Sequence, residues 1–169
     1  MTRKAGPGRP RTPMHQRFWA KVDKTDSCWN WTGAPSQYGY GRIGLDGVQT
    51  LAHRYSWELH KQEPLAGRQL DHICHNKMCV NPRHLRIVTQ AQNNQNWQGA
   101  QQRNPTGVRG VHLTGVKTRR GRPYKVEATL DGVTYYGGRF RTLEEAAEAA
   151  RQLRLSLFTH NDADRRSAC

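Results

Sequence analysis

Five side chains between residues 72 and 93 are of the types that bind metal ions and move protons. They are His72, Cys74, Cys79, His84 and Asn93. The spacing Cys-x4-Cys-x4-His puts two thiols and an imidazole in one short loop, and a structural zinc ion takes such ligands in tetrahedral geometry. Cys28, which lies upstream, would complete a Cys3His zinc site. The alternative interpretation is a pair of buried free thiols.

The cysteine content favours a metal site over a disulfide framework. The chain has 4 cysteines and is expected to lack a secretory leader, and disulfides are rare in such proteins. Cys169, the last residue, is expected to be a free tail thiol. The region around the loop has few large apolar residues. Bound zinc, worth roughly 10 kcal/mol or more of folding free energy, is therefore expected to replace a missing core.

A second metal centre is indicated by Asp71 and Asn93, which flank the zinc loop. Asp71 and His72 end an expected strand at 69–73, and Asn93 lies on an expected helix, so a hairpin followed by a helix brings them together. Carboxylate and amide oxygens suit Mg²⁺ or Mn²⁺. An unperturbed imidazole, with a pKa of about 6.5, is largely neutral at pH 7 and can take a proton from water. We therefore expect His72 and Asn93 to meet beside one divalent ion.

These residues resemble the His-Cys box homing endonucleases, a branch of the HNH (ββα-metal, or His-Me finger) nucleases. The matching pattern is His72-x-Cys74-x4-Cys79-x4-His84-x8-Asn93, and the similarity covers roughly residues 28–97. It extends to His75-Asn76, Asn81-Pro82, Asn96-Trp97, Leu51-Ala52-His53-Arg54 and Gly39-Tyr40-Gly41-Arg42. The opening Cys28-Trp29-x-Trp31 and the pair Asp71-His72 look more like the HNH enzymes of phages and introns.

The resemblance implies a metal-dependent DNA endonuclease in which His72 is the general base. Asn93 matches a ligand of one catalytic Mg²⁺ or Mn²⁺ ion, and Asp71 stands where phage-type enzymes have a second ligand. Arg42 matches a cation that contacts the scissile phosphate. The ligands of one structural zinc ion match Cys28, Cys74, Cys79 and His84. Homing enzymes of this branch carry a second Cys/His cluster, which this sequence lacks, so a homodimer is not assumed.

The segment 52–57 is interpreted as the start of a structural helix, with lining of the site by His53 and Arg54 as the alternative. Three expected tryptophan core positions are Trp29, Trp31 and Trp57.

Three strands and a helix are predicted in the C-terminal segment. The strands are expected at 107–113, 124–130 and 133–138 because apolar and polar residues alternate there. Asp131-Gly132 is a typical hairpin turn. Thr142 and Glu145 have the spacing of a capping box, and apolar residues follow at helical spacing.

This segment resembles an AP2-type DNA-binding domain over roughly fifty residues. The similar pieces are Arg109-Gly110-Val111, Tyr124, Tyr136-x-Gly138-x-Phe140 and Thr142-x-Glu144-Glu145-Ala146-Ala147. That family lays its sheet in the major groove of DNA. The positions that match its contacts are Arg109, His112, Tyr124 and Thr129. The alternative is a small α+β domain whose cations are only solvated.

The charge of the chain predicts a polyanionic partner, most commonly nucleic acid, with a basic protein that has no such partner as the alternative; the two resemblances imply that this partner is double-stranded DNA. Lys and Arg number 27 against 13 Asp and Glu, for a net charge of +14. Gly8-Arg9-Pro10-Arg11 resembles the core of an AT-hook, so Arg9 and Arg11 are further candidate DNA contacts, with a solvated tail as the alternative. No run approaches the ~20 apolar residues of a membrane span. We expect a cytoplasmic protein, in the bacterial host if a phage encodes it, and neither secretion nor membrane binding.

The predicted fold is α+β, with a zinc-stabilised ββα-metal nuclease core before the AP2-like domain. The expected parts are a basic tail (1–13), the nuclease domain (14–97), a linker (98–105), the AP2-like domain (106–160) and a C-terminal tail (161–169). The rival function is a non-catalytic AP2-like DNA-binding regulator with a structural zinc. Asp71, His72 and Asn93 separate the two, because a zinc scaffold needs none of them. RNA binding or cleavage is a third, weaker interpretation, since no RNA-specific aromatic motif is present.

Overall fold

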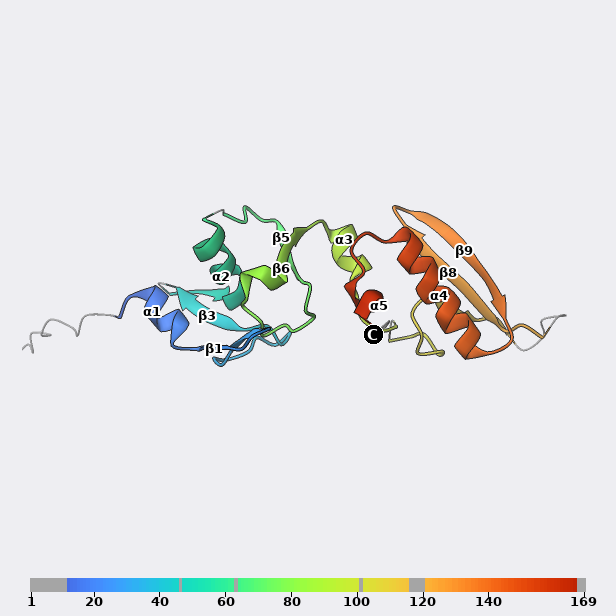
Figure 1. The fold of residues 1–169 in the computed structure, drawn as a ribbon, viewed down its shortest axis with the longest axis horizontal. Coiled ribbons are helices and arrows are strands. Elements are labelled where there is room, and N and C mark those ends of the chain that lie inside the picture. Colours follow the sequence, from blue (N-terminus) through green and yellow to red (C-terminus); the bar gives the residue numbers. More distant parts are fainter. Residues whose placement is uncertain (1–11, 46, 63, 101, 116–120, 167–169) are drawn as a thin grey trace, which may run out of the picture. The chain divides into compact units, whose positions relative to one another are not determined.

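The structure is a computed structural model that describes residues 12–45, 47–62, 64–100, 102–115 and 121–166. Arg9 and Arg11 of the basic tail, and Cys169, lie outside the described residues. Contacts divide the chain into two units, Met1–Ile87 and Val88–Cys169. Each unit mixes helices with strands, as expected for an α+β chain (Figure 1). Within the described residues no helix is long and apolar enough to cross a membrane.

The first unit is built from short elements that pair locally. Its described elements are α1 (Met14–Trp19), β1 (Val22–Lys24), β2 (Trp29–Trp31), β3 (Arg42–Leu45), β4 (Val48–Leu51), α2 (Ala52–Lys61), β5 (Gln69–His72), the 3-10 turn η1 (Pro82–His84) and β6 (Leu85–Val88), which ends just across the division. The strands form two-stranded sheets in the orders β1-β2, β3-β4 and β5-β6. The expected strand at 69–73 and the expected helix start at 52–57 are both confirmed.

Two small apolar clusters hold this unit together. One contains Phe18, Trp31, Ile43, Ala52 and Val80, and the other contains Trp57, Leu65 and Leu85. The Phe18 ring stacks on that of Trp31, with 5.4 Å between the ring centroids. Trp31 and Trp57 are therefore core residues, as expected, and Trp29 packs against the first cluster. The modest size of both clusters agrees with the expectation that a metal site supplements the core.

Gly41 is required by the packing of Trp31. A Cβ atom at this position would lie 2.5 Å from Cδ1 of Trp31, closer than atoms of a side chain and a buried ring can approach. We expect Gly41→Ala to lower the free energy of unfolding by about 1–3 kcal/mol, because overpacking forces the ring or the backbone to shift. Denaturant unfolding measures the change.

Gly44→Ala, in the same strand region, is the matched control, because its new methyl group would approach only the flexible end of Gln49, at 3.5 Å. Equal stability of the two variants would contradict this packing.

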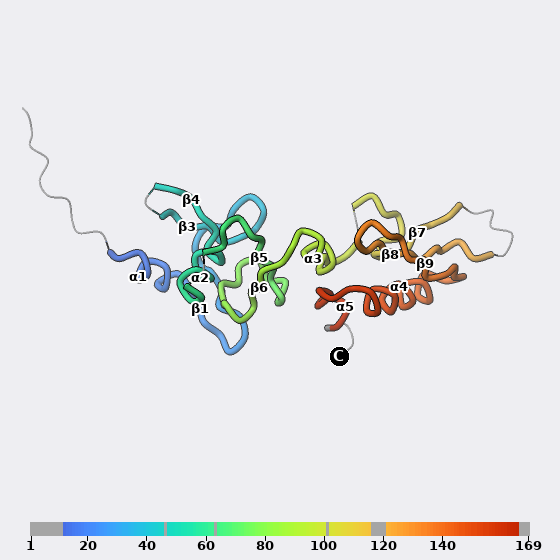
Figure 2. Tube along the Cα trace, turned by 90° about the horizontal axis from the view of Figure 1, so that it is seen from above, coloured from blue at the N-terminus to red at the C-terminus, as the bar shows by residue number. Residues whose placement is uncertain are grey.

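The second unit contains a three-stranded sheet covered by a helix. Its described elements are α3 (Gln90–Gln95), β7 (Val111–Leu113), β8 (Tyr124–Leu130), β9 (Val133–Phe140), α4 (Leu143–Leu157) and α5 (Asp162–Arg166). The sheet is antiparallel in the order β7-β8-β9, and α4 lies along one of its faces (Figure 2). Val111, Val126, Ala146 and Ala150 form the core between sheet and helix.

The expected turn and helix start are present. Asp131 and Gly132 both have positive φ, of 50° and 81°, as the tight turn between β8 and β9 requires. Thr142 accepts a hydrogen bond from the Glu145 backbone N–H at 3.2 Å and so caps α4. The Glu145 side chain accepts instead from the Arg141 N–H, at 3.3 Å, so the second bond of the expected capping box goes one residue upstream.

The first strand of this sheet is shorter than expected. The sequence pattern predicted a strand from residue 107, but Gly107 and Gly110 adopt positive φ values of 66° and 78° and interrupt it. The side-chain amide of Asn104 stabilises the resulting loop by donating to the carbonyls of Val108 and Val111, at 2.8 and 2.9 Å. The strand therefore begins only at Val111.

The helix α3 groups with the second unit. The division between the two units, at Ile87/Val88, therefore falls inside the expected nuclease domain (14–97). It comes before the expected linker at 98–105. This helix begins at Thr89, whose hydroxyl accepts from the Gln92 N–H while the Gln92 side chain accepts from the Thr89 N–H. Sequence reasoning missed this capping box, although Thr-x-x-Gln is a recognisable helix start.

Candidate active site and metal centre

Four ligand-type side chains of the first unit meet in one cluster. Cys28, Cys74, Cys79 and His84 place one ligand atom each so that all lie within 4.8 Å of one another. Sγ of Cys28 and Sγ of Cys79 each lie 3.6 Å from Nδ1 of His84. In a tetrahedral site with Zn–S of about 2.3 Å and Zn–N of about 2.0–2.1 Å, the ligand atoms are roughly 3.5–3.8 Å apart. The donor set and its spacing therefore fit a Cys3His metal site.

The local fold brings Cys28 to the loop that carries the other three ligands. Asn30, in the middle of β2, forms an isolated antiparallel β-bridge with Cys79. The Asn81 side chain donates to the Ser27 carbonyl at 2.8 Å and accepts from the Arg83 N–H at 3.0 Å, so it ties the loop to the segment before Cys28. Asn81 thus shapes the loop.

The Cys79 thiol has an environment that favours a thiolate. A hydrogen bond from the Cys74 thiol holds the pKa of the Cys79 thiol well below its ordinary value. Thiolates, not thiols, bind metal ions. The Cys74 and Cys79 side chains are therefore suited to bind a metal cation.

His72 is oriented by the same loop. The His72 side chain is buried, and its Nε2 lies 3.0 Å from the carbonyl oxygen of Cys79. A carbonyl only accepts, so Nε2 carries the hydrogen and Nδ1 is the acceptor of the neutral ring. Burial lowers the pKa of His72, an effect that the Cys79 carbonyl partly offsets. The ring is thus held neutral, with one nitrogen able to take a proton.

Two other rings contact His72. The centroid of His53 lies 4.7 Å from that of His72 in an edge-to-face arrangement, and the centroid of Tyr40 lies 5.9 Å away. Burial is the main cause that lowers the pKa of His53 to about 3, with smaller electrostatic effects from His72 and Arg54, so this ring is also neutral. The expected helix start is present, and it also places His53 against the candidate base, in agreement with the alternative that His53 lines the site.

Asp71 is paired with a cation of the neighbouring strand. Nε and Nη2 of Arg86 donate to Oδ2 of Asp71 at 3.0 and 2.8 Å. Arg86 was not singled out in the sequence, because its contact with Asp71 depends on the pairing of β6 with β5.

Arg42 lies at the start of β3 and is exposed. It lines a cleft of about 310 Å³ together with Arg17 and Lys21. Three cations around one cleft provide a favourable place for a phosphate group.

Asn93 lies on α3, as expected, in the second unit, whereas His72 belongs to the first. The meeting of these two side chains at one ion therefore stays a prediction.

The candidate DNA contacts of the second unit fall in different places. His112 and Thr129 lie exposed on the sheet. Tyr124 packs against the core beneath α4. The Arg109 guanidinium donates to backbone carbonyls at the end of α3 instead of projecting from the sheet.

The comparison with protein families agrees with the chemistry of this region. Residues 50–95 match the family model described as HNH endonuclease. The matched segment includes His72, Asn93 and three of the four cluster ligands. It supports a nuclease domain in this segment of the chain.

Phage proteins are among the relatives of the chain. Protein 2.8 of Escherichia phage T7 is 31% identical over 83 residues, which cover 47% of this chain and 56% of the relative. Protein 7.7 of the same phage is 33% identical over 70 residues, which cover 41% of this chain and 54% of the relative. The chain thus spans little more than half the length of these relatives. No solved structure matches the chain.

Proposed function

We propose that the protein is a DNA endonuclease in which His72 activates water. The Nδ1 atom of His72 accepts a proton as the water oxygen bonds to the scissile phosphorus and the bond from phosphorus to the 3′-oxygen breaks. The leaving 3′-oxygen takes a proton from solvent, which gives 5′-phosphate and 3′-hydroxyl ends. The observation that carries this proposal is the hydrogen bond between His72 Nε2 and Cys79 O, at 3.0 Å, which leaves Nδ1 as the proton acceptor.

Asn93, and Asp71 with it, would hold a Mg²⁺ or Mn²⁺ ion. Such an ion stabilises the charge that develops on the phosphate and on the leaving oxygen. The Asn93 amide would supply one oxygen ligand, and the Asp71 carboxylate lies beside His72 in sequence and is held in place by Arg86. The Cys3His cluster would hold Zn²⁺ as a scaffold and so fix the Cys79 carbonyl that orients His72.

Several surfaces would bind the DNA. The cleft lined by Arg17, Lys21 and Arg42 suits the phosphate backbone, and Arg42 would contact the scissile phosphate. The exposed sheet positions His112 and Thr129 would serve an AP2-like module, and the basic tail would add affinity that does not depend on sequence. The enzyme would be of a homing or phage-borne type and would act in the cytoplasm of a bacterial host, which the phage origin of its relatives supports.

A second function, DNA binding without cleavage, is favoured by one observation. Arg86 binds Oδ2 of Asp71 and competes with a metal ion for that oxygen. In this alternative the Cys3His cluster is a scaffold, and the protein acts as a DNA-binding regulator.

Cleavage of a supercoiled plasmid separates the two functions. The zinc-loaded protein is incubated with plasmid in buffers with and without Mg²⁺ or Mn²⁺; no chelator is used, because it would also remove zinc. The endonuclease converts the plasmid to nicked or linear forms only with the added ion, and ligase reseals the ends. A gel shift of the plasmid without cleavage in either ion would support the regulator instead.

A further inference from the structure

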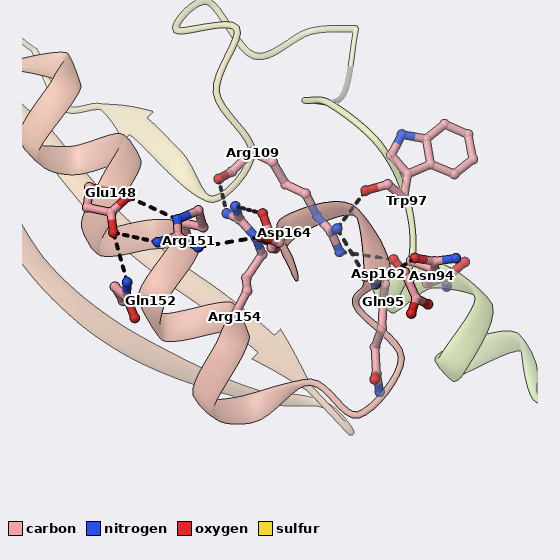
Figure 3. A network of polar contacts seen from close by, with 11 residues as sticks. Asn94, Gln95, Trp97, Arg109, Glu148, Arg151, Gln152, Arg154, Asp162 and Asp164 are labelled. Atoms are coloured by element: carbon pink, nitrogen blue, oxygen red, sulfur yellow. Dashed lines mark hydrogen bonds and ion pairs between the residues drawn. The ribbon is translucent and has the colours of Figure 1, made fainter. Parts of the chain in front are cut away.

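Arg109 holds the carboxyl end of α3. Its Nη1 donates to the carbonyls of Gln95 and Trp97, at 3.1 and 2.6 Å, and its Nη2 donates to that of Asn94, at 3.0 Å (Figure 3). The last carbonyls of a helix have no partner within the helix, and a cation there also complements the helix dipole. One guanidinium therefore satisfies three carbonyls at the end of the helix that carries Asn93.

The backbone of Arg109 is itself fixed to the core of the second unit. Nη1 of the buried Arg154 donates to the Arg109 carbonyl at 2.5 Å, and Asp164 accepts two hydrogen bonds from Arg154, both at 2.7 Å (Figure 3). The Gly110 carbonyl accepts from the N–H of Glu127 in β8 at 3.0 Å. A Cβ at Gly110 would lie 2.9 Å from the Glu127 carbonyl oxygen, so the close approach requires glycine. Arg109 thus projects from a rigid base.

Side chains at the end of α3 add a second attachment. Oε1 of the buried Gln95 accepts from the N–H groups of Thr159 and His160, at 3.0 and 3.1 Å. Oδ1 of Asn96 accepts from the N–H of Asp162 at 3.0 Å, at the start of α5. The segment that follows α4 therefore also binds α3.

A helix of this length depends on such contacts. α3 has 6 residues, and isolated helices shorter than about 12–15 residues are marginal in water. Its amino end is capped locally by Thr89, but its carboxyl end relies on Arg109 and on the Gln95 and Asn96 side chains. The position of Asn93, within the last turn of α3, follows from these contacts.

We propose that Arg109 is a positioning residue for Asn93 and, through it, for the catalytic ion. This inference rests on the proposed function, in which Asn93 is a metal ligand. It assigns to Arg109 the fixing of a helix in place of a direct contact with DNA. It also makes the C-terminal sheet and helix module part of the machinery that presents the ligand.

The test measures metal affinity and local order in the full-length, zinc-loaded protein without DNA. Mn²⁺ affinity is determined by electron paramagnetic resonance, and amide hydrogen exchange is followed in residues 90–97 and in β8. The variants are Arg109→Lys, which keeps a cation but not the planar fork, Arg109→Met, which keeps the packing, and Asn93→Ala. The exposed Arg141, whose side chain makes none of these contacts, provides the control Arg141→Ala.

We expect both Arg109 variants to bind Mn²⁺ about 10-fold or more weakly than wild type, the usual effect of losing a partner that orients a ligand. Exchange should quicken in residues 90–97 and stay slow in β8, and Arg141→Ala should match wild type. Arg109→Lys should weaken Mn²⁺ binding no further in an Asn93→Ala background, because both changes act through one ligand.

Faster exchange in α3 with unchanged Mn²⁺ affinity would limit Arg109 to a structural role. That result would overturn this inference but leave the proposed function intact. If Asn93→Ala itself leaves Mn²⁺ affinity unchanged, the metal assignment of the proposed function fails, and the inference fails with it.

Discussion

His72→Ala is expected to cut supercoiled plasmid at least ~100-fold more slowly than wild type under single-turnover conditions with Mg²⁺. The change removes the group that takes the proton from water, and losing a general base costs about 10²–10⁴-fold in rate. Binding of DNA should persist, because the cationic cleft lined by Arg17, Lys21 and Arg42 is untouched. Loss of plasmid supercoiling with time measures the rate, and a gel shift measures the binding.

The control must separate lost chemistry from lost structure, since His72 is buried and bonded to Cys79 O. His72→Gln, which keeps a polar side chain there, should keep zinc and thermal stability but show the same loss of rate. His15→Ala, at an exposed position on α1, should cut like wild type. Equal rates for wild type and a folded, zinc-containing His72→Ala would remove His72 from the mechanism.

Cys74→Ser should lose both its zinc and its stable fold. Metal binding in such a small-cored unit contributes roughly 10 kcal/mol or more of folding free energy, far above what the two apolar clusters can replace. Elemental analysis gives the zinc content, and denaturant unfolding followed by tryptophan fluorescence gives the stability of the first unit.

Cys169→Ser is the comparison for that experiment, because the last residue is expected to be a free thiol, and it should keep one zinc per chain. Cleavage by Cys74→Ser should also vanish, since the metal loop supplies the carbonyl that orients His72. A stably folded, zinc-free Cys74→Ser protein would refute the scaffold role.

Local patterns predicted the elements that depend on local physics. Alternation, a two-residue turn and a cap defined β8, the Asp131-Gly132 turn and the start of α4, because each depends on neighbours within a few residues. The Cys3His cluster was also predictable, because few residue types bind a structural metal ion and the chain has only 4 cysteines. Even the distant ligand Cys28 followed from this scarcity.

Contacts between distant segments escaped prediction. Arg154 occupies the next inward position after Ala146 and Ala150 on α4, and it is buried there only because Asp164 neutralises it. Arg109 matched a DNA-contact position, but its guanidinium also binds carbonyls at the end of α3, including that of Gln95, 14 residues upstream. A pattern along the chain does not contain such partners.

The same reasoning applies to the surroundings of the candidate base. His53 was correctly placed at a helix start, but its contact with His72 depends on how α2 packs against β5, which spacing does not specify. The pairing of Asp71 with Arg86 likewise required the register of β5 and β6.

The central claim is that His72 and Asn93 serve the same divalent ion, and paramagnetic broadening by Mn²⁺ tests it most directly. Nuclear magnetic resonance of the zinc-loaded, full-length protein follows the ring protons of His72 and the side-chain amide of Asn93 as Mn²⁺ is added. We predict that both signals broaden together at the same Mn²⁺ concentration, while the exposed His15 ring stays sharp. Broadening of one signal without the other would place the two side chains at different sites and contradict the proposed nuclease centre.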